Sequence, residues 1–232
     1  GELHTGLRTA NPMSHVWRGL VGTSAMGLSF AGLGLLPLPE VTAIGYAAPI
    51  LVVIFAAMFL GEQVRLFRLS MVALGLVGVL IVLSPRLQVD PASVDTRETL
   101  GAVIVLMAAV CAALAQVFVR KLVQTETVSA IVFYFSVTAT LLSLLTLPWG
   151  WVLPSVQVIG LLICAGLLGG VGQILLTTRY RHADASLIAP FEYTSMLLAI
   201  VVGYTIFGEV PGAATLAGGT MIVIAGILII LR

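Results

Sequence analysis

Charged residues are scarce in this chain: only 9% of its 232 residues are Asp, Glu, Lys or Arg. Apolar residues make up 59% of the sequence and the mean hydropathy is +1.14, values that a water-soluble domain of this length does not reach. A net charge of +1 gives no electrostatic reason to expect nucleic acid as a partner. The composition therefore predicts a protein whose main surroundings are the lipid bilayer.

The motifs of common enzymes and metal sites are also missing. The sequence contains no HExxH, no Walker-type phosphate loop and no GxSxG. Its three histidines, His4, His15 and His182, are not spaced as metal ligands, and its two cysteines, Cys111 and Cys164, both fall in apolar runs. We therefore expect no enzymatic activity, no metal and no cofactor. We expect the cysteines to be buried small side chains and not a disulfide.

Long apolar runs are what the chain does have. A helix needs about 20 apolar residues to cross roughly 30 Å of hydrocarbon, and eight runs come close to this length. With boundaries good to about four residues, the runs lie at 18–36, 41–60, 69–84, 99–118, 128–147, 154–176, 185–207 and 212–231. The sequence therefore predicts an all-α integral membrane protein, a helical bundle of eight transmembrane spans.

One hairpin of this bundle occurs twice. Ile44–Glu62 reads IGYAAPILVVIFAAMFLGE and Phe191–Glu209 reads FEYTSMLLAIVVGYTIFGE. In this alignment Tyr46 matches Tyr193, and both segments end in Gly-Glu. The copies lie five spans apart, which makes five helices the repeating unit.

The repeat divides the chain into three parts. Residues 1–84 hold three spans of a first repeat, residues 85–98 form a polar linker, and residues 99–232 form a complete second repeat of five spans. The chain also begins without a methionine or a signal peptide. We therefore expect an N-terminally truncated copy of a ten-span protein that lacks its first two helices.

The distribution of basic residues predicts the topology, because Lys and Arg are retained on the cytoplasmic side of a membrane. Eight spans place both termini on one face, and nine of the eleven basic residues fall there, leaving only Arg86 and Arg97 on the other. Both termini are thus predicted to be cytoplasmic. The corner at Glu62 then faces the cytoplasm and that at Glu209 the exterior, so the repeats are inverted, as in many secondary transporters.

One acidic residue is predicted at membrane depth. Glu192 lies about seven residues past the cytoplasmic end of span 185–207, on the order of 10 Å deep, where a charge costs about 2.5–3.5 kcal/mol. Pro190 loosens the helix before it, and transporters place binding sites at broken helices. Three roles are open for Glu192: a proton carrier, a fixed charge that attracts a cationic group of the substrate, or a structural hydrogen bond between helices.

Polar side chains around this carboxylate complete the candidate substrate-binding or coupling site. Three follow it in sequence, one is the repeat counterpart of Tyr193, and two are glutamines within other spans. These residues are Tyr193, Thr194, Ser195, Tyr46, Gln116 and Gln173. Either they line a substrate cavity or they pack between helices with their hydrogen bonds satisfied locally, as is common for polar side chains in lipid.

Three segments of the chain resemble a known family. Leu60–Glu62 (LGE), Phe207–Glu209 (FGE) and Ala189–Thr194 (APFEYT) are similar to motifs of the EamA-type transporters of the drug/metabolite transporter superfamily, and the resemblance covers essentially the whole chain. It implies ten helices in two inverted repeats that move small metabolites, amino acids or drugs across the bacterial inner membrane through a central cavity. The missing first two helices are the departure from this pattern.

Together these features predict a secondary transporter, an exporter or an uptake carrier, that works by alternating access. Its partners would be a small-molecule substrate and the lipid bilayer, with the oligomeric state open between monomer and homodimer. Proton coupling through Glu192 is one hypothesis for the driving force, since the chain has no nucleotide-binding motif. The alternative is a multi-span scaffold or assembly subunit without transport, and an intramembrane enzyme is disfavoured.

Overall fold

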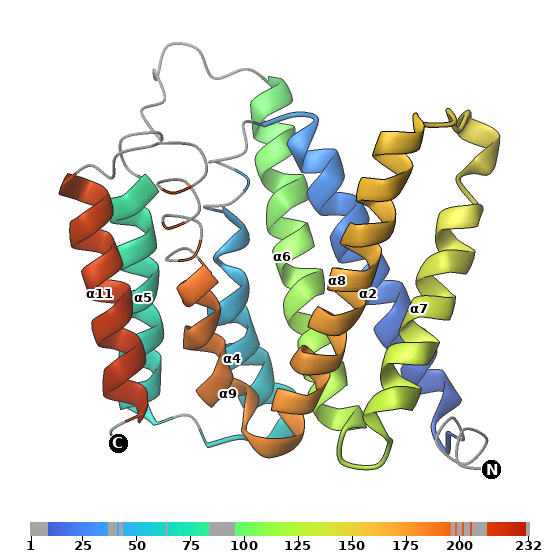
Figure 1. Ribbon diagram of the computed structural model, residues 1–232. Helices are drawn as coiled ribbons and strands as arrows, with labels where there is room; N and C mark the ends of the chain where they lie inside the picture. The colour runs from blue at the N-terminus through green and yellow to red at the C-terminus, as the bar shows by residue number, and fades with distance from the viewer. Residues whose placement is uncertain are drawn as a thin grey trace. The chain divides into compact units, whose positions relative to one another are not determined.

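The computed structural model of the chain describes residues 9–36, 41, 44–63, 65–83, 96–195, 198, 201, 205 and 213–230. The secondary structure of these residues is helical (Figure 1). In chain order the α-helices are α2 (Pro12–Leu33), α4 (Ala48–Leu60), α5 (Leu66–Leu83), α6 (Thr96–Leu122), α7 (Val128–Leu144), α8 (Val156–His182), α9 (Ala185–Ile188) and α11 (Ala213–Ile230), and the 3-10 helices are η3 (Leu147–Trp149) and η4 (Ala189–Tyr193). The predicted all-α fold is confirmed for this part of the chain.

Two helices among the described residues are long and apolar enough to cross a membrane by themselves. They are Thr99–Leu122 within α6 and Val156–His182, the whole of α8. Shorter apolar helical segments are Ala48–Leu60, Leu66–Ile81, Val128–Leu144 and Leu216–Ala225. Most of the predicted span 185–207 beyond residue 195 lies outside the described residues. The count of eight spans and the inverted arrangement of the repeats therefore stay predictions.

Helix α4 shows how the sequence sets the limits of a helix. It begins at Ala48, later than the predicted span 41–60, and Pro49 occupies its first turn, where the missing N–H would have had no partner in any case. It is followed by Gly61, whose φ of 66° lies in the left-handed region that glycine adopts without strain. The Gly-Glu corner of the first repeat is therefore the C-terminal cap of α4.

The described chain forms two compact units, each assembled from segments far apart in sequence. Unit 1 comprises residues 1–23 and 118–183 and contains the start of α2, the end of α6, and all of α7 and α8. Unit 2 comprises residues 24–117 and 184–232 and contains α4, α5, α9, η4 and α11 with the rest of α2 and α6. Each unit thus draws on both predicted sequence repeats.

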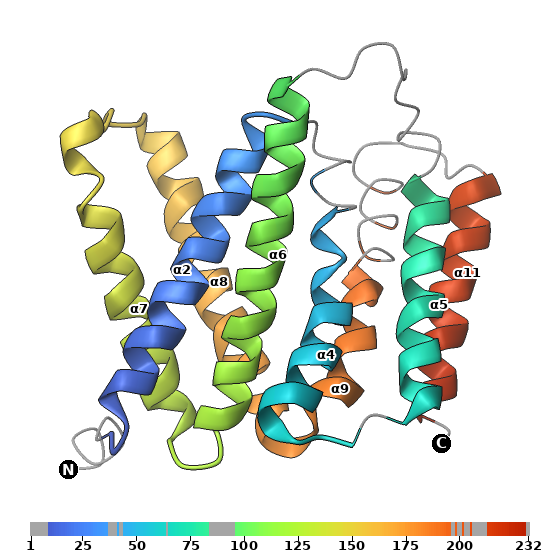
Figure 2. The ribbon, with the colours of Figure 1, turned by 180° about the vertical axis from the view of Figure 1, so that it is seen from behind.

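Buried aliphatic side chains and a glycine allow α5 and α11 to pack closely in unit 2. The two helices lie side by side in both views (Figures 1 and 2). Val72 and Val79 of α5 and Ile222 of α11 are completely or almost completely buried. A Cβ atom added to Gly78 would lie 2.8 Å from the backbone oxygen of Gly218. The absence of a side chain at Gly78 therefore lets the two backbones approach as closely as in packed membrane helices.

Helix α8 of unit 1 turns apolar side chains outward along most of its length. Leu161 is 70% exposed and Leu167 is 69% exposed. Cys164 on this helix is also exposed, whereas Cys111 in α6 is partly buried, and both thiols are free. The expected burial is wrong for Cys164, because it lies on a face of α8 that no described helix covers. The apolar run around it shows that the residue lies in a helix and not which face of that helix is covered.

Replacing Gly78 with alanine should destabilise the protein, because the new methyl group meets a backbone carbonyl that has little freedom to move. We expect a loss of about 1–3 kcal/mol, as for other overpacked sites. Gly27→Ala in α2 is the matched control, since its new Cβ would have no atom within 4 Å. Because alanine has a higher helix propensity than glycine, this variant should gain up to about 1 kcal/mol of stability. Thermal unfolding in detergent micelles measures both effects, and equal midpoints for the two variants would contradict the close packing of α5 on α11.

Candidate functional site

Glu192 lies where a helix changes its form. The single α-helical turn α9 is followed directly by the 3-10 helix η4, which has Pro190 near its start. The Glu192 side chain is partly buried, and its Oε2 accepts a hydrogen bond of 3.4 Å from Nε2 of Gln116 in α6. The structure thus contains a helix break at Pro190 and joins two of the predicted site residues there.

The two tyrosines that match in the repeats are in direct contact. The ring centroids of Tyr46 and Tyr193 are 5.7 Å apart, with the rings tilted by 47°. The Tyr193 hydroxyl donates a hydrogen bond of 3.4 Å to the backbone oxygen of Tyr46, and Tyr193 is fully buried. Its ring packs on Gly75 of α5, where a Cβ atom would collide with it. In this conformation Tyr193 closes the space between these segments and does not line an open cavity.

Ser195 connects Tyr46 with the turn that carries Glu192. Its Oγ donates to the backbone oxygen of Glu192 over 2.7 Å and lies 3.1 Å from the Tyr46 hydroxyl oxygen. Because the single hydroxyl hydrogen of serine is used on the carbonyl, the Tyr46 hydroxyl is the donor in the second bond. Thr194 donates to the backbone oxygen of Phe191 over 2.6 Å, so its hydroxyl is satisfied within its own turn.

The structure brings six of the seven predicted site residues into unit 2. Five of them form one connected group: Gln116, Glu192, Ser195, Tyr46 and Tyr193. The seventh, Gln173, lies in unit 1, where its Oε1 accepts a hydrogen bond of 3.0 Å from Nη2 of Arg18. The binding or coupling role of these residues stays a prediction.

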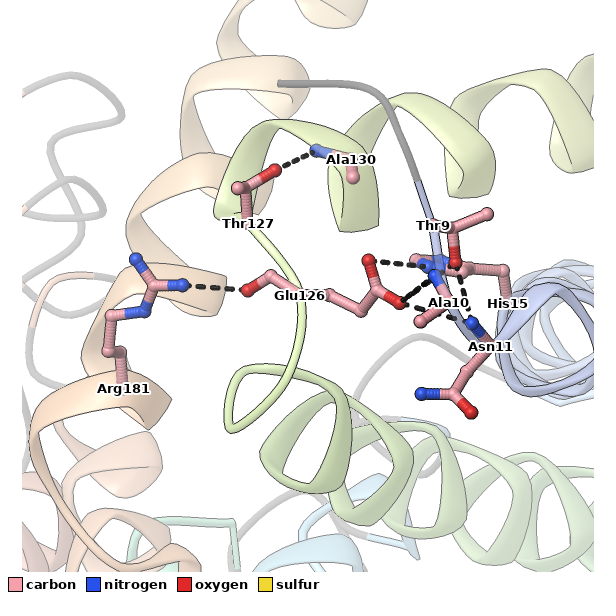
Figure 3. Close-up of polar contacts among 8 residues, drawn as sticks. All are labelled: Thr9, Ala10, Asn11, His15, Glu126, Thr127, Ala130 and Arg181. Carbon is pink, nitrogen blue, oxygen red and sulfur yellow. Dashed lines mark hydrogen bonds and ion pairs between the residues drawn. The ribbon is translucent and has the colours of Figure 1, made fainter. Parts of the chain in front are cut away.

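A second polar cluster surrounds Glu126, in the loop between α6 and α7, and was not predicted from the sequence (Figure 3). Glu126 is buried, and its Oε1 accepts hydrogen bonds from the Thr9 hydroxyl (2.9 Å), the Ala10 N–H (2.9 Å) and the Asn11 N–H (3.2 Å). These three residues immediately precede α2. The carboxylate therefore lies at the positive, N-terminal end of that helix and satisfies backbone donors there.

The Glu126 cluster also joins α7 and α8. Nη2 of Arg181, near the end of α8, donates to the backbone oxygen of Glu126 over 2.7 Å (Figure 3). The next residue, Thr127, caps α7 by accepting a hydrogen bond of 3.2 Å from the Ala130 N–H. Nε2 of His15 in α2 lies 3.9 Å from Oε2 of Glu126. One loop thus fixes the ends of three helices of unit 1.

The hydrogen bonds keep Glu126 ionised. Burial raises the pKa of the Glu126 carboxyl, but the three hydrogen bonds from the residues before α2 outweigh it, together with attraction to His15 when that imidazole is protonated, and hold the pKa below its ordinary value of 4.5. The pKa of His15 lies below 6.5, chiefly because of burial and also because of nearby Arg18, although Glu126 opposes this shift. At neutral pH the pair is therefore a carboxylate beside a neutral imidazole.

Little in the sequence indicates the Glu126 cluster. The hydroxyl and the two backbone N–H groups that donate to its carboxylate lie 115 to 117 residues away in the sequence, and a single sequence carries no information about contacts at such separations. The one local signal is Thr127, a good N-cap residue directly before the apolar run 128–147. That signal predicts the start of a helix and not the burial of its neighbour.

The surface of the described chain carries large apolar side chains that water would not tolerate in such number. Leu153 is 93% exposed, Val152 88% and Val156 85%. Several polar side chains within the helices, in contrast, have hydrogen-bond partners inside the protein, as Thr138 has in α7 and Gln173 in α8. This arrangement is that of a helical membrane protein, in which polar groups find their partners inside the protein.

The chain belongs to the EamA-like transporter family, which matches residues 4–84 and 99–232. The pseudopaline exporter CntI of Pseudomonas aeruginosa is 30% identical over 90% of this chain and 71% of its own length. The S-adenosylmethionine uptake transporter of Rickettsia bellii is 27% identical over 97% of this chain and 74% of its own. The riboflavin transporter of Rhizobium johnstonii is 26% identical over 96% of this chain and 72% of its own.

A solved crystal structure also matches, with a TM-score of 0.83 and 21% identity over 97% of this chain and 80% of that chain. At this identity the match shows the fold alone. The family and the relatives above are transporters and not enzymes. The chain is accordingly a secondary transporter of small metabolites, and the predicted family and the predicted transport of small metabolites are confirmed.

Glu126→Gln should destabilise the protein at neutral pH, because a neutral amide replaces the charge at the start of α2. We expect a loss of about 1–2 kcal/mol. A carboxyl whose pKa is lowered by folding stabilises above pH 4.5 and loses its contribution as the pH falls through its folded-state value. The gap between wild type and variant should therefore shrink towards pH 3, measured as the midpoint of thermal unfolding.

Asp184→Asn is the control for Glu126→Gln. Asp184 pairs with Arg68 at 3.7 Å, and its side chain is 46% exposed, so its loss should cost less than about 1 kcal/mol. A Glu126→Gln variant that follows the wild-type pH profile would show that the Glu126 carboxylate does not support α2.

Proposed function

We propose that this transporter carries a small metabolite across the bacterial inner membrane by alternating access, driven by protons that bind at Glu192. The observation that carries the proposal is the hydrogen bond between Glu192 and Gln116 at a helix break. A glutamine amide can donate to an ionised carboxylate and, after turning over, accept from a protonated one. Gln116 can therefore serve Glu192 in both states, as a proton carrier requires.

The contact between Tyr46 and Tyr193 is the closing element of this proposal. Alternating access needs a contact that seals the site on one side and can open without breaking a strong bond. The ring contact and the long 3.4 Å hydrogen bond between the two tyrosines meet this condition. Opening would expose Tyr193, Tyr46 and Ser195 beside Glu192, and these side chains would then line the substrate pathway.

The proposal includes an inverted topology. Eight spans, a first repeat in residues 1–84 and a second in residues 99–232 would place both termini of this chain in the cytoplasm. Residues related by a pseudo-two-fold axis come into contact only where they lie near that axis. The contact between Tyr46 and Tyr193, which match in the repeats, supports such an axis within unit 2.

The relatives indicate a class of substrate and include both directions of transport. The relatives include an exporter and uptake transporters, so both directions occur among them. Their names specify three different metabolites, pseudopaline, S-adenosylmethionine and riboflavin. We therefore propose a small metabolite with several polar groups as the substrate.

Transport by the natural full-length protein in proteoliposomes tests the role of Glu192. A pH gradient is imposed, a panel of amino acids, S-adenosylmethionine and riboflavin is offered, and wild type is compared with Glu192→Gln. We expect the variant to lose gradient-driven flux by about tenfold or more, because this flux requires a carboxyl that binds and releases a proton. Exchange of substrate for substrate requires no proton transfer and should stay within about twofold of wild type.

The control is Glu62→Gln, a variant of another carboxylate in unit 2. Glu62 accepts a hydrogen bond of 3.0 Å from the backbone N–H of Ala185, a bond that the amide oxygen of glutamine can keep. This variant should retain gradient-driven flux. Undiminished flux in Glu192→Gln would assign Glu192 to a structural bond between helices. The absence of any flux in wild type for every compound would favour a scaffold without transport.

A further inference from the structure

Arg18 is a buried cation in unit 1 that takes no part in the proposed proton coupling. It lies in α2, three residues after His15, and only 4% of its surface is exposed. A charge in such surroundings is stable only when it is paired and hydrogen-bonded. The partners of its guanidinium group therefore decide what Arg18 can do.

The guanidinium group is only partly satisfied. Its Cζ lies 3.6 Å from the centre of the Phe135 ring, and Nη2 donates to Oε1 of Gln173 over 3.0 Å. Nε and Nη1 are both buried and have no hydrogen-bond partner among the described residues. Of the five N–H groups of arginine, these two nitrogens carry three. Buried donors of Arg18 therefore remain that bind no group in the described part of the chain.

No carboxylate neutralises this charge within the described part of the chain. Arg18 forms no ion pair there, and the buried acid of the same unit, Glu126, has its charge directed to Thr9, Ala10 and Asn11. The other strong contact of Arg18, with the face of Phe135, supplies only a weak, partial negative charge. Among the described residues of unit 1, this fixed positive charge thus has no counter-ion.

A glycine one turn after Arg18 leaves space for this guanidinium group. A Cβ atom added to Gly22, one turn further along α2, would lie 2.7 Å from Nη1 of Arg18 and 3.1 Å from Cε2 of Phe135. Only a glycine at this position leaves the group where it is. Phe135 holds it from the α7 side and Gln173 from the α8 side, so its plane and its free donors have fixed directions.

We propose that Arg18, oriented by Gln173 and Phe135, binds an oxyanion of the transported substrate, such as a carboxylate. A planar guanidinium with several free donors matches the paired oxygens of a carboxylate or phosphate, and a buried site strengthens the interaction. The inference deepens the proposed function, on which it rests, by naming an acidic group as a feature of the substrate. A lipid headgroup phosphate has the same chemistry, and the experiments below separate the two sources.

The first experiment compares acids with their amides. The natural full-length protein in phosphatidylcholine nanodiscs is heated with benzoate, succinate or L-methionine, and with benzamide, succinamide or L-methioninamide, which lack the carboxylate. We expect at least one acid to raise the midpoint of thermal unfolding by about 3 °C more than its amide, because a ligand that binds only the folded protein stabilises it. Equal shifts for every acid and its amide would overturn the proposal.

Substitutions at Arg18 localise the effect. Arg18→Met retains an apolar side chain of similar length without the charge, and the difference between acid and amide should vanish. Arg18→Lys keeps a charge but not the planar fork, and it should retain only part of the difference. Lys121→Met, which removes an exposed cation from the same unit, should behave like wild type. A difference that persists in Arg18→Met would overturn the proposal, and if that variant does not fold, an undiminished difference in Arg18→Lys would do so.

Nanodiscs that contain phosphatidylglycerol separate lipid from substrate. If this lipid stabilises wild type but not Arg18→Met, and acids then add nothing, the occupant is a headgroup phosphate and the assignment to substrate is wrong. If acids still stabilise wild type in these nanodiscs, the assignment is supported. These measurements involve neither a gradient nor flux, so their failure leaves the role of Glu192 untouched, and a failure of proton coupling leaves the oxyanion site untouched.

Discussion

A polar group among transmembrane helices has to find its partner inside the protein, because hydrocarbon offers none. At the helix break of unit 2, the hydroxyls of Thr194 and Ser195 donate to backbone oxygens of Phe191 and Glu192. In unit 1, the Glu126 carboxylate accepts backbone N–H groups at the start of α2. The polar clusters of both units therefore arise from the need to satisfy helix ends. The charged groups of Glu192 and Arg18 do not take part in these bonds at the helix ends, and they are the two charges to which we assign functional roles.

The repeated Gly-Glu corner also connects the two halves of the sequence within unit 2. Gly61 ends α4, and the Glu62 carboxylate accepts the backbone N–H of Ala185, the first residue of α9. Helix α9 leads directly into η4 and therefore to Glu192. A motif of the first repeat thus supports the segment of the second repeat that carries the candidate carboxylate. The motif acts on the site through the position of a helix and not through contact with it.

The sequence alone predicts the features that depend on local composition or on internal similarity. Apolar length predicts the helices, depth within a run singles out Glu192, and the repeat pairs Tyr46 with Tyr193, which the structure places in contact. The exact start of α4 and the exposure of Cys164 were not predicted, since they depend on a turn and on which face of α8 is covered. The burial of Arg18 was missed for a stronger reason. Its partner Gln173 is 155 residues away in the sequence, and only the folded chain shows that the two side chains are in contact.

The two candidate charges together constrain the energetics of transport. A substrate that brings one carboxylate to Arg18 and moves in the same direction as one proton from Glu192 carries no net charge, so the membrane potential neither drives nor opposes it. Movement of the substrate anion and the proton in opposite directions transfers two elementary charges per cycle across the membrane, worth about 4.6 kcal/mol at 100 mV. The voltage dependence of flux therefore distinguishes uptake with protons from export against them. Because relatives of this chain work in both directions, the same pair of charges would serve either one, and the membrane potential would favour the exchange of a substrate anion leaving for a proton entering.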